Sequence, residues 1–310
     1  MNQLFKNVTI VKASLPESST FNTLVEPMGF TPLDGQAHTI RTYGFVLKEE
    51  TMPELGYAKR LTDGYAFTVR IQERIIPSSV VTEETDKRIA AFKEAGGRKY
   101  KRGGIKDEVL LELIPKAFIR TTNVLCVYLK TSGLLLIANT GNKVLNTVYG
   151  MLLRTLEHEN IQIQDRAFDE SRYHAVTQNI LNLFLDTGDA SGFPLEIVDY
   201  VKLSEPDNGE KNGTVFKNAS LDDLQASFSK AFQMAQTIVD TKFSNGAMSF
   251  KMAVNGKLRS IKFLEAAGLE TDFEDSEEHY NYLLESESAL LAGAVKTIDA
   301  LFADDIDDVI

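Results

Sequence analysis

The sequence predicts an α+β fold, in which strands and helices are interspersed without a regular β–α–β alternation. Three observations lead to this class. Residues Phe67 to Gln72 alternate apolar and polar side chains, which is the two-residue period of a half-buried strand. Apolar residues recur at every fourth position from Ile105 to Leu113, which indicates a helix. Asn255-Gly256 stands between two β-rich segments, and this dipeptide favours a tight hairpin.

The first half of the chain contains six predicted elements. In order, they are a strand at Val8–Lys12, the alternating strand that ends before Pro77, a helix at Thr82–Ala95 stopped by Gly96-Gly97, a helix from Ile105 to Pro115, and strands at Leu125–Lys130 and Leu134–Ala138. Thr131-Ser132-Gly133 separates the last two strands and indicates a hairpin.

The second half is predicted to be richer in helices. Helices are expected at Lys143–Leu156, Ser171–Leu185, Leu221–Asp240 and Glu285–Leu301, and hairpin strands at Met248–Val254 and Leu258–Phe263. Ser204–Gly213 is rich in Asn, Glu and Gly and is expected to be a loop or a domain junction. We expect two α+β regions, residues 1–165 with a basic helix–loop–helix segment at 79–118, and residues 166–310 with an acidic tail at 303–310.

The charge of the chain is unevenly distributed. The net charge of −11 by itself argues against a nucleic-acid-binding protein. However, residues 264–310 hold fourteen acidic residues and one base, Lys296, so the rest of the chain carries about +2. Lys87 to Lys106 holds eight Lys or Arg and a single acid, Glu94. The composition therefore favours a molecule with a basic middle and an acidic end.

The composition also indicates a cytosolic protein. No run of about 18 apolar residues is present, so no membrane span is expected. The first ten residues lack the pattern of a signal peptide. The single cysteine, Cys126, lies in an apolar run, where a buried core residue is the expected role and a reactive thiol the alternative.

Motifs for catalysis are absent from the sequence. It contains no nucleotide-binding glycine loop, no HExxH and no GxSxG. The four histidines are scattered, at His38, His158, His174 and His279. The acidic residues cluster near the C-terminus, where a solvated face is the usual interpretation and a metal site the rarer one. We therefore expect no enzyme activity, no metal and no cofactor, although a site assembled from residues distant in the sequence would leave no such motif.

The segment from Gly96 to Gly104 places four cations between two glycine pairs. The cations are Arg98, Lys99, Lys101 and Arg102, with Tyr100 among them. Lys and Arg on a mobile backbone can meet phosphates and release counterions, and Tyr100 can stack on a base or sugar. The alternative, a solvated connection between two helices, has equal weight on composition alone.

Several further segments follow one another along the chain: LFKN at 4–7, GFTP at 29–32, QERIIPSSVV at 72–81, IKDEVL at 105–110 running into LIPKAF at 113–118, TSGL at 131–134, and NGKLRSIKF at 255–263. Taken in this order, they resemble the RdgC family, the recombination-associated proteins of bacteria and some phages. Together they span nearly the whole chain.

The resemblance implies a curved subunit that forms a ring-shaped homodimer around DNA. Duplex DNA, bound without sequence preference, is the implied partner, and single-stranded DNA is a further candidate. By occupying DNA, the family opposes RecA function, which implies a location at the nucleoid. A Mg²⁺-dependent exonuclease, and a protein that binds a recombination factor and hardly touches DNA, are the alternatives.

The resemblance also assigns residues. Arg98 and Lys99 match the family's basic pair, Lys116 matches a basic position, and Arg259 and Lys262 match the late hairpin. With their neighbours, the expected DNA-binding set is Arg98, Lys99, Lys101, Arg102, Lys116, Arg120, Lys257, Arg259 and Lys262. The sequence departs from the family pattern near Lys217, where one lysine survives from a longer polar run, and at Met234, where a base is expected.

Two further expectations concern Phe118 and the acidic tail. Phe118 follows Pro115 and lies between Lys116 and Arg120, and the resemblance places it at a subunit contact; ordinary core packing is the alternative. The tail ends in four aspartates and Val309-Ile310. It is expected to compete with DNA for a basic groove, to dock on a partner, or only to aid solubility.

Overall fold

The computed structural model describes residues 3–49, 55–96, 101–157, 162–187, 194–204, 214–217, 237–270 and 272–302. Two antiparallel sheets dominate it. The first follows the order β2-β4-β5-β6-β1-β7, with β3 paired to β4, and the second the order β12-β11-β10-β8-β9. Antiparallel sheets with segregated helices confirm the predicted α+β class.

The strands of the first sheet are β1 (Thr9–Ala13), β2 (Arg41–Val46), β3 (Lys59–Leu61), β4 (Gly64–Ile75), β5 (Phe118–Leu129), β6 (Leu134–Ile137) and β7 (Ile163–Asp165). Those of the second are β8 (Glu196–Ser204), β9 (Val215–Lys217), β10 (Thr237–Ser244), β11 (Met248–Ala253) and β12 (Leu258–Phe263). The helices are α1 (Ser18–Val25), α2 (Ser78–Glu94), α3 (Arg102–Leu113), α4 (Asn142–Thr155), α5 (Glu170–Thr187) and α7 (Ser276–Phe302), with short 3-10 turns at Glu26–Met28, Ile114–Lys116 and Glu265–Ala267.

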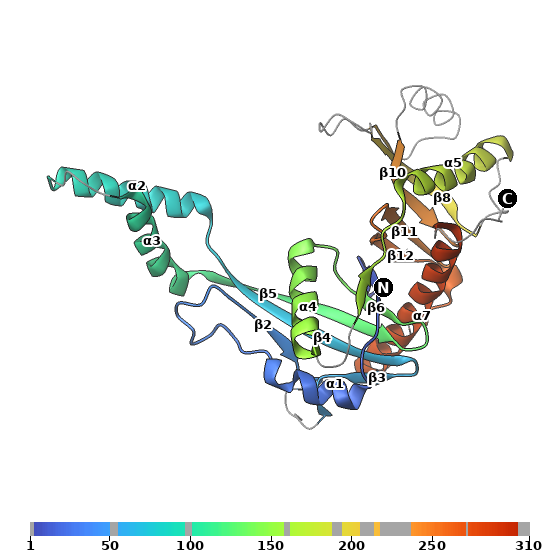
Figure 1. Cartoon of the computed structure of the whole chain (residues 1–310), viewed down its shortest axis with the longest axis horizontal. Helices are drawn as coiled ribbons and strands as arrows, with labels where there is room; N and C mark the ends of the chain where they lie inside the picture. The colour runs from blue at the N-terminus through green and yellow to red at the C-terminus, as the bar shows by residue number, and fades with distance from the viewer. Residues whose placement is uncertain are drawn as a thin grey trace.

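A long two-stranded ribbon forms the axis of the molecule. Strands β4 and β5 are 12 residues each and pair in register from Tyr65↔Tyr128 to Ile75↔Phe118. Figure 1 shows the ribbon running between the helical pair α2–α3 at one end and the second sheet at the other, which gives the chain a bent outline. Gly64, at the start of β4, has a φ of +112° and lies against the carbonyl of Tyr128, where a side chain would collide.

The ribbon is buried on both faces over its inner half. On one face Tyr65, Phe67 and Val69 join a core built with α1 and α4. On the other face Ala66 and Val127 join a larger core that includes α5, α7 and the second sheet. The second sheet therefore has one apolar face, covered by α5 and α7, and one polar face. In Figure 1, α7 runs along the side of this sheet that is turned away from α2–α3.

The N-terminal segment joins the two sheets. Val8 N donates to Leu258 O at 2.8 Å, Leu258 N donates back to Val8 O at 2.9 Å, and Ile261 N donates to Lys6 O at 2.9 Å. These bonds extend the second sheet beyond its edge strand β12. The next residue, Thr9, starts β1 and pairs with Ile137 in the first sheet. One short stretch of backbone thus belongs to both sheets.

A buried carboxylate secures this segment. Glu287 of α7 is 0% exposed, and its Oε2 accepts the backbone N–H groups of Leu4 at 2.9 Å and Phe5 at 3.0 Å. Burial raises the pKa of Glu287 to about 7, although the two N–H donors act in the opposite direction. The carboxyl of Glu287 therefore titrates in the range where most carboxylates are already ionised.

Most predicted elements are confirmed. The strand at residues 67–72, both hairpins, and the helices α2, α3, α4, α5 and α7 are present. Several of them are longer than predicted. The prediction missed the first half of β5 because that half is solvent-exposed and shows no apolar alternation, and it missed the start of α7 because the first turn of that helix is polar.

The predicted helix at Leu221–Asp240 is wrong at its C-terminal end. Residues from Thr237 onward form strand β10, which is paired on both sides. Thr237, Ile238 and Val239 are β-branched, and this run favours a strand inside a sheet. Residues 221–236 lie outside the described residues, as do 205–213 of the predicted loop, and the division at residue 165 stays a prediction.

Glu287 should make the stability of the protein depend on pH. Its ordinary pKa is 4.5, and the folded value is raised to about 7, so the folded state holds an extra proton between these values. The free energy of unfolding should therefore fall as pH rises through this window, by at most about 1.4 kcal/mol per pH unit for one group. Urea unfolding between pH 5 and 8 measures this slope.

The variant Glu287→Gln should flatten that slope, because the amide does not titrate. Glu278→Gln, an exposed acid in the first turn of the same helix, is the control and should keep the slope of the parent protein. Equal slopes in the parent and in Glu287→Gln would contradict this account.

Candidate nucleic-acid interface

The helical pair α2–α3 projects from the end of the ribbon as an arm (Figure 1). Helix α2 follows β4 after Pro77, and α3 returns the chain to β5 through a 3-10 turn at Ile114–Lys116. The buried residues of the arm, within its described part, are few: Val81, Thr85, Ile89, Val109 and Ile114. None of them belongs to either of the two main cores, so the two helices are held mainly by each other.

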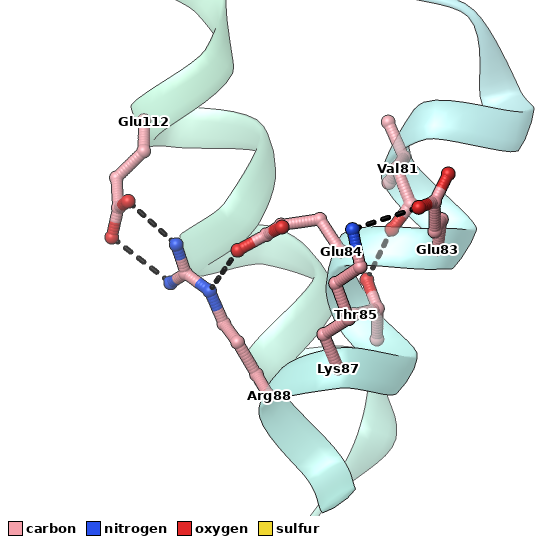
Figure 2. Close-up of polar contacts among 7 residues, drawn as sticks. All are labelled: Val81, Glu83, Glu84, Thr85, Lys87, Arg88 and Glu112. Carbon is pink, nitrogen blue, oxygen red and sulfur yellow. Dashed lines mark hydrogen bonds and ion pairs between the residues drawn. The ribbon is translucent and has the colours of Figure 1, made fainter. Parts of the chain in front are cut away.

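Ion pairs along the arm occupy several of its cations. Arg88 of α2 donates to both carboxylate oxygens of Glu112 of α3, at 2.9 and 2.6 Å, and also pairs with Glu84 at 3.4 Å (Figure 2). Hydrogen bonding to Arg88 lowers the pKa of Glu112. Lys87 pairs with Glu83 at 2.7 Å, and Arg102 with Asp86 at 2.6 Å. Such exposed pairs contribute little to stability, but they cancel positive charge on the helices.

Two of the predicted DNA-binding cations stand at the described start of α3. Lys101 is exposed at the start of the described part of the second helix, and Arg102 beside it is paired with Asp86. The predicted DNA-binding residues Arg98 and Lys99 lie outside the described residues.

Phe118 lies at the base of the arm and is 89% exposed. Its partner across the ribbon, Ile75, is 39% exposed. Beside them is a shallow hollow of about 520 Å³, lined by Asp34, Gly35, Ala37, Arg74, Pro115, Ala117, Phe118 and Ile119. An exposed aromatic next to an open hollow is a feature of protein contacts. Within a single chain, Phe118 is not a core residue.

The other predicted cations near Phe118 differ in their surroundings. Lys116 is exposed in the 3-10 turn. Arg120 forms an ion pair with Glu73, and Lys143 binds the second oxygen of the same carboxylate at 2.6 Å. Glu73 is largely buried, and its hydrogen bonds to Lys143 and Arg120 lower its pKa. Arg120 is therefore held by an acid of its own chain.

The three predicted cations of the late hairpin also divide. Lys257 Nζ donates to Thr140 O at 3.1 Å and to Asn142 Oδ1 at 2.7 Å, so it ties the hairpin to the start of α4. Arg259 donates to Asp240 Oδ2 at 2.6 Å. Lys262 is exposed and stands opposite Ser249 on β11. Of the three, Lys257 is a structural residue.

The polar face of the second sheet carries cations that the sequence patterns did not single out. Lys242 of β10 stands directly opposite Lys251 of β11, which stands opposite Arg259 of β12. Lys202 of β8 faces Asp240 on the same side. The sequence signal was available, because Lys242 and Lys251 each follow the two-residue period of their strands. The strand that carries Lys242 was not recognised, because its first residues, up to Asp240, were predicted to be the end of a helix.

This row of cations is incompletely neutralised within the described part of the sheet. Lys242 pairs with Asp199 at 2.9 Å, Arg259 binds Asp240, and Lys251 lies 3.6 Å from the centre of the Tyr200 ring. With Glu196, these two acids accompany a larger set of cations on the same strands: Lys202, Lys242, Lys251, Arg259 and Lys262. Like charges directly opposite each other destabilise a sheet. A polyanion lying across the strands relieves that repulsion.

The described residues contain no group of three or more His, Cys, Asp or Glu side chains that could hold a metal ion. Cys126 is buried, and burial raises the pKa of its thiol. His174 Nδ1 accepts the N–H of Ile238, and the ring of His279 stacks on Phe273. Among the described helices, none is both long and apolar enough to cross a bilayer.

The family model and the relatives that match this chain all carry the name of one family. A family model described as "RdgC: Putative exonuclease, RdgC" matches residues 3–304. A protein of Shewanella frigidimarina named "Recombination-associated protein RdgC" is 22% identical over 271 residues, 84% of each chain. The protein of that name from Pseudomonas aeruginosa strain LESB58 is 27% identical over 143 residues, 45% of this chain and 47% of the relative. The latter match spans about half of the length of that relative.

The surroundings of Lys257 and Lys262 predict unequal effects of substitution on the free energy of unfolding. Lys257→Ala should lower the free energy of unfolding by about 1 kcal/mol, because it removes two hydrogen bonds between the hairpin and α4. Lys262→Ala should change it by no more than about 0.5 kcal/mol, because this side chain is exposed. Urea unfolding of the two variants checks both values. Equal losses would mean that the hydrogen bonds of Lys257 contribute nothing.

Proposed function

The chain belongs to the RdgC family, and from that premise we propose that it binds duplex DNA without sequence preference and closes around it as a homodimer. Single-stranded DNA is a secondary ligand of the same surface. By occupying DNA, the protein opposes RecA and so restrains recombination at the nucleoid. The protein acts by binding, with neither cofactor nor catalytic residues.

The observation that carries the proposal is the row Lys242, Lys251 and Arg259 across three neighbouring strands. Phosphate contacts supply affinity that is independent of sequence, because every nucleotide carries the same charge. A flat sheet face offers no recognition helix for the major groove. It suits a protein that follows the backbone of a duplex and ignores its bases.

The shape of the chain supports a clamp. The arm and the second sheet stand at opposite ends of the ribbon, and the polar face of the sheet lies on the opposite side from α5 and α7 (Figure 1). DNA placed along this polar face is within reach of a second subunit. The acidic residues concentrated in α7 then lie behind the sheet, away from the phosphates.

Phe118 supports self-association. The exposed ring and the neighbouring hollow belong to the same surface. In a two-fold contact, the same patch is used by both subunits, so each Phe118 can enter the hollow of its partner. An aromatic anchor in such a pocket contributes about 2 kcal/mol or more to binding. This contact at the base of the arm is our candidate for closing the ring.

Two other functions make different experimental predictions. The family description includes the words "putative exonuclease", and an exonuclease would shorten a labelled duplex in the presence of Mg²⁺ but not EDTA. A protein that acts only through a recombination factor would give no shift of naked duplex at low salt. Under our proposal the duplex is shifted without a partner and stays full length with Mg²⁺.

Affinity for duplex DNA should fall steeply with salt and be equal for unrelated sequences of the same length. The double variant Lys242→Gln/Lys251→Gln should reduce the slope of log Kd against log salt by about 2, because each lost phosphate contact contributes about 0.9. Fluorescence anisotropy with two duplexes at several salt concentrations measures this. The control Lys12→Gln/Arg60→Gln removes two exposed cations of the first sheet and should leave the slope unchanged. A slope shared by parent and Lys242/Lys251 variant excludes the sheet face as the binding surface.

Phe118→Ser should weaken dimerisation without loss of fold, because the side chain is exposed in the single chain. Light scattering after size exclusion should show a shift toward monomer over a range of concentrations, and the circular dichroism spectrum should stay that of the parent. The matched control Leu264→Ser alters an apolar residue that is 38% exposed beyond β12. If both variants keep the oligomeric state of the parent, Phe118 does not form the subunit contact.

A further inference from the structure

A second cationic groove lies between strand β2 and helix α4, apart from the row on the second sheet. It is a hollow of about 320 Å³. From β2 it is lined by Arg41 and Tyr43, and from α4 by residues at positions 143, 146, 147, 150, 151 and 154. This spacing of three and four places the α4 residues on one face of the helix. The groove therefore runs along about three turns of α4.

The groove carries a surplus of positive charge. None of the residues that line it is acidic, whereas Arg41, Lys143 and Arg154 are basic. Glu73 of β4 stands opposite Arg41 of β2 in the strand pairing. Its two carboxylate oxygens are already engaged by Arg120 and Lys143. One carboxylate thus serves several cations, and Arg41 and Arg154 form no ion pair among the described residues.

The Arg41 side chain is held by two contacts, and one of its N–H donors has no acceptor in the described part of the chain. Its NH2 group donates to Thr147 Oγ1 at 2.7 Å, and its guanidinium carbon lies 5.7 Å from the centre of the Tyr43 ring. Its Nε is buried and has no hydrogen-bond acceptor among the described residues. Because Nε is buried, an anion in the groove would meet the guanidinium through its terminal nitrogens, which form the face suited to paired oxygens.

Gly150 leaves space at the centre of the groove. It lies in the middle of α4, where glycine is less favourable than alanine. A side-chain carbon at this position would meet no atom within 4 Å, so crowding by the protein does not require glycine here. The missing side chain leaves the helix surface open between Arg41 and Arg154. The open space at Gly150 is therefore available to a ligand and is not needed for packing within the chain.

We propose that this groove binds a phosphate group, with Arg41 and Arg154 as its principal cations and Asn146 and Thr147 as polar neighbours. Arginine matches the paired oxygens of phosphate better than it matches a monatomic anion. The source we assign is the DNA backbone, and this assignment rests on the proposed function. The groove then gives DNA a contact on the first sheet that is separate from Lys242 and Lys251.

Titration calorimetry of the full-length chain with pyrophosphate tests the groove directly. Gly150→Leu places a side chain in the open space, where its first carbon meets no other atom, and should weaken pyrophosphate binding at least tenfold. The matched control is Gly293→Leu, another mid-helix glycine with nothing within 4 Å, which should bind as the parent does. Arg154→Gln, which alters an exposed side chain, should weaken binding in the same way and guards against misfolding of Gly150→Leu.

The proposal is overturned if Gly150→Leu and Arg154→Gln bind pyrophosphate as tightly as Gly293→Leu. Anisotropy with duplex DNA then identifies the source of the phosphate. A loss of duplex affinity in Gly150→Leu supports the DNA backbone, and unchanged affinity rejects DNA in favour of a free phosphate compound. If the parent protein binds no duplex at all, the proposed function fails, but the pyrophosphate titration still decides whether the groove exists as a site.

Discussion

The relation between the two sheets depends on the backbone hydrogen bonds of residues 4–8. This segment adds to the edge of β12, continues directly into β1, and places its amides on the buried carboxylate of Glu287. Because α7 contributes Glu287 and also packs the back of the second sheet, the segment fixes three parts of the fold relative to one another. The direction in which the polar sheet face points relative to the ribbon and arm follows from this junction. Together with the apolar core that both sheets share, it gives the cations of the two sheets a defined geometry.

The cations of the chain fall into two physical classes. Some are bound by acids or carbonyls of their own chain, as Arg88 is by Glu112 and Lys257 by Thr140 O. Others lie where positive charge exceeds the acids nearby, as on the second sheet and beside α4. The sequence does not distinguish the two classes, because the ion-pair partner of a lysine depends on which strands and helices come together in the fold. The net charge of −11 is compatible with DNA binding because the surplus of acid lies in residues 264–310.

Local patterns predicted much of the fold, and long-range pairing explains the rest. The Asn255-Gly256 hairpin, α4 and α5 have strong local signals and were predicted within one or two residues. The exposed half of β5 has no such signal, because its strand conformation comes from pairing with β4. Of the candidate site, Arg259 and Lys262 were predicted from the family resemblance. Lys242, Lys251 and Lys143 were not predicted, since only the register of strands and the packing of α4 place them beside other cations.

The arm has a small core of its own, so its length can change without any change in the two sheets. Val81, Ile89, Val109 and Ile114 pack apart from both main cores, and the chain enters the arm at Pro77 and leaves it around Pro115. Adding one turn to each of α2 and α3 lengthens the reach by about 5.4 Å and leaves every strand register as it is. The arm is thus a module whose length is set independently of the sheets. The width of anything that two such subunits enclose is therefore adjustable by insertion or deletion alone.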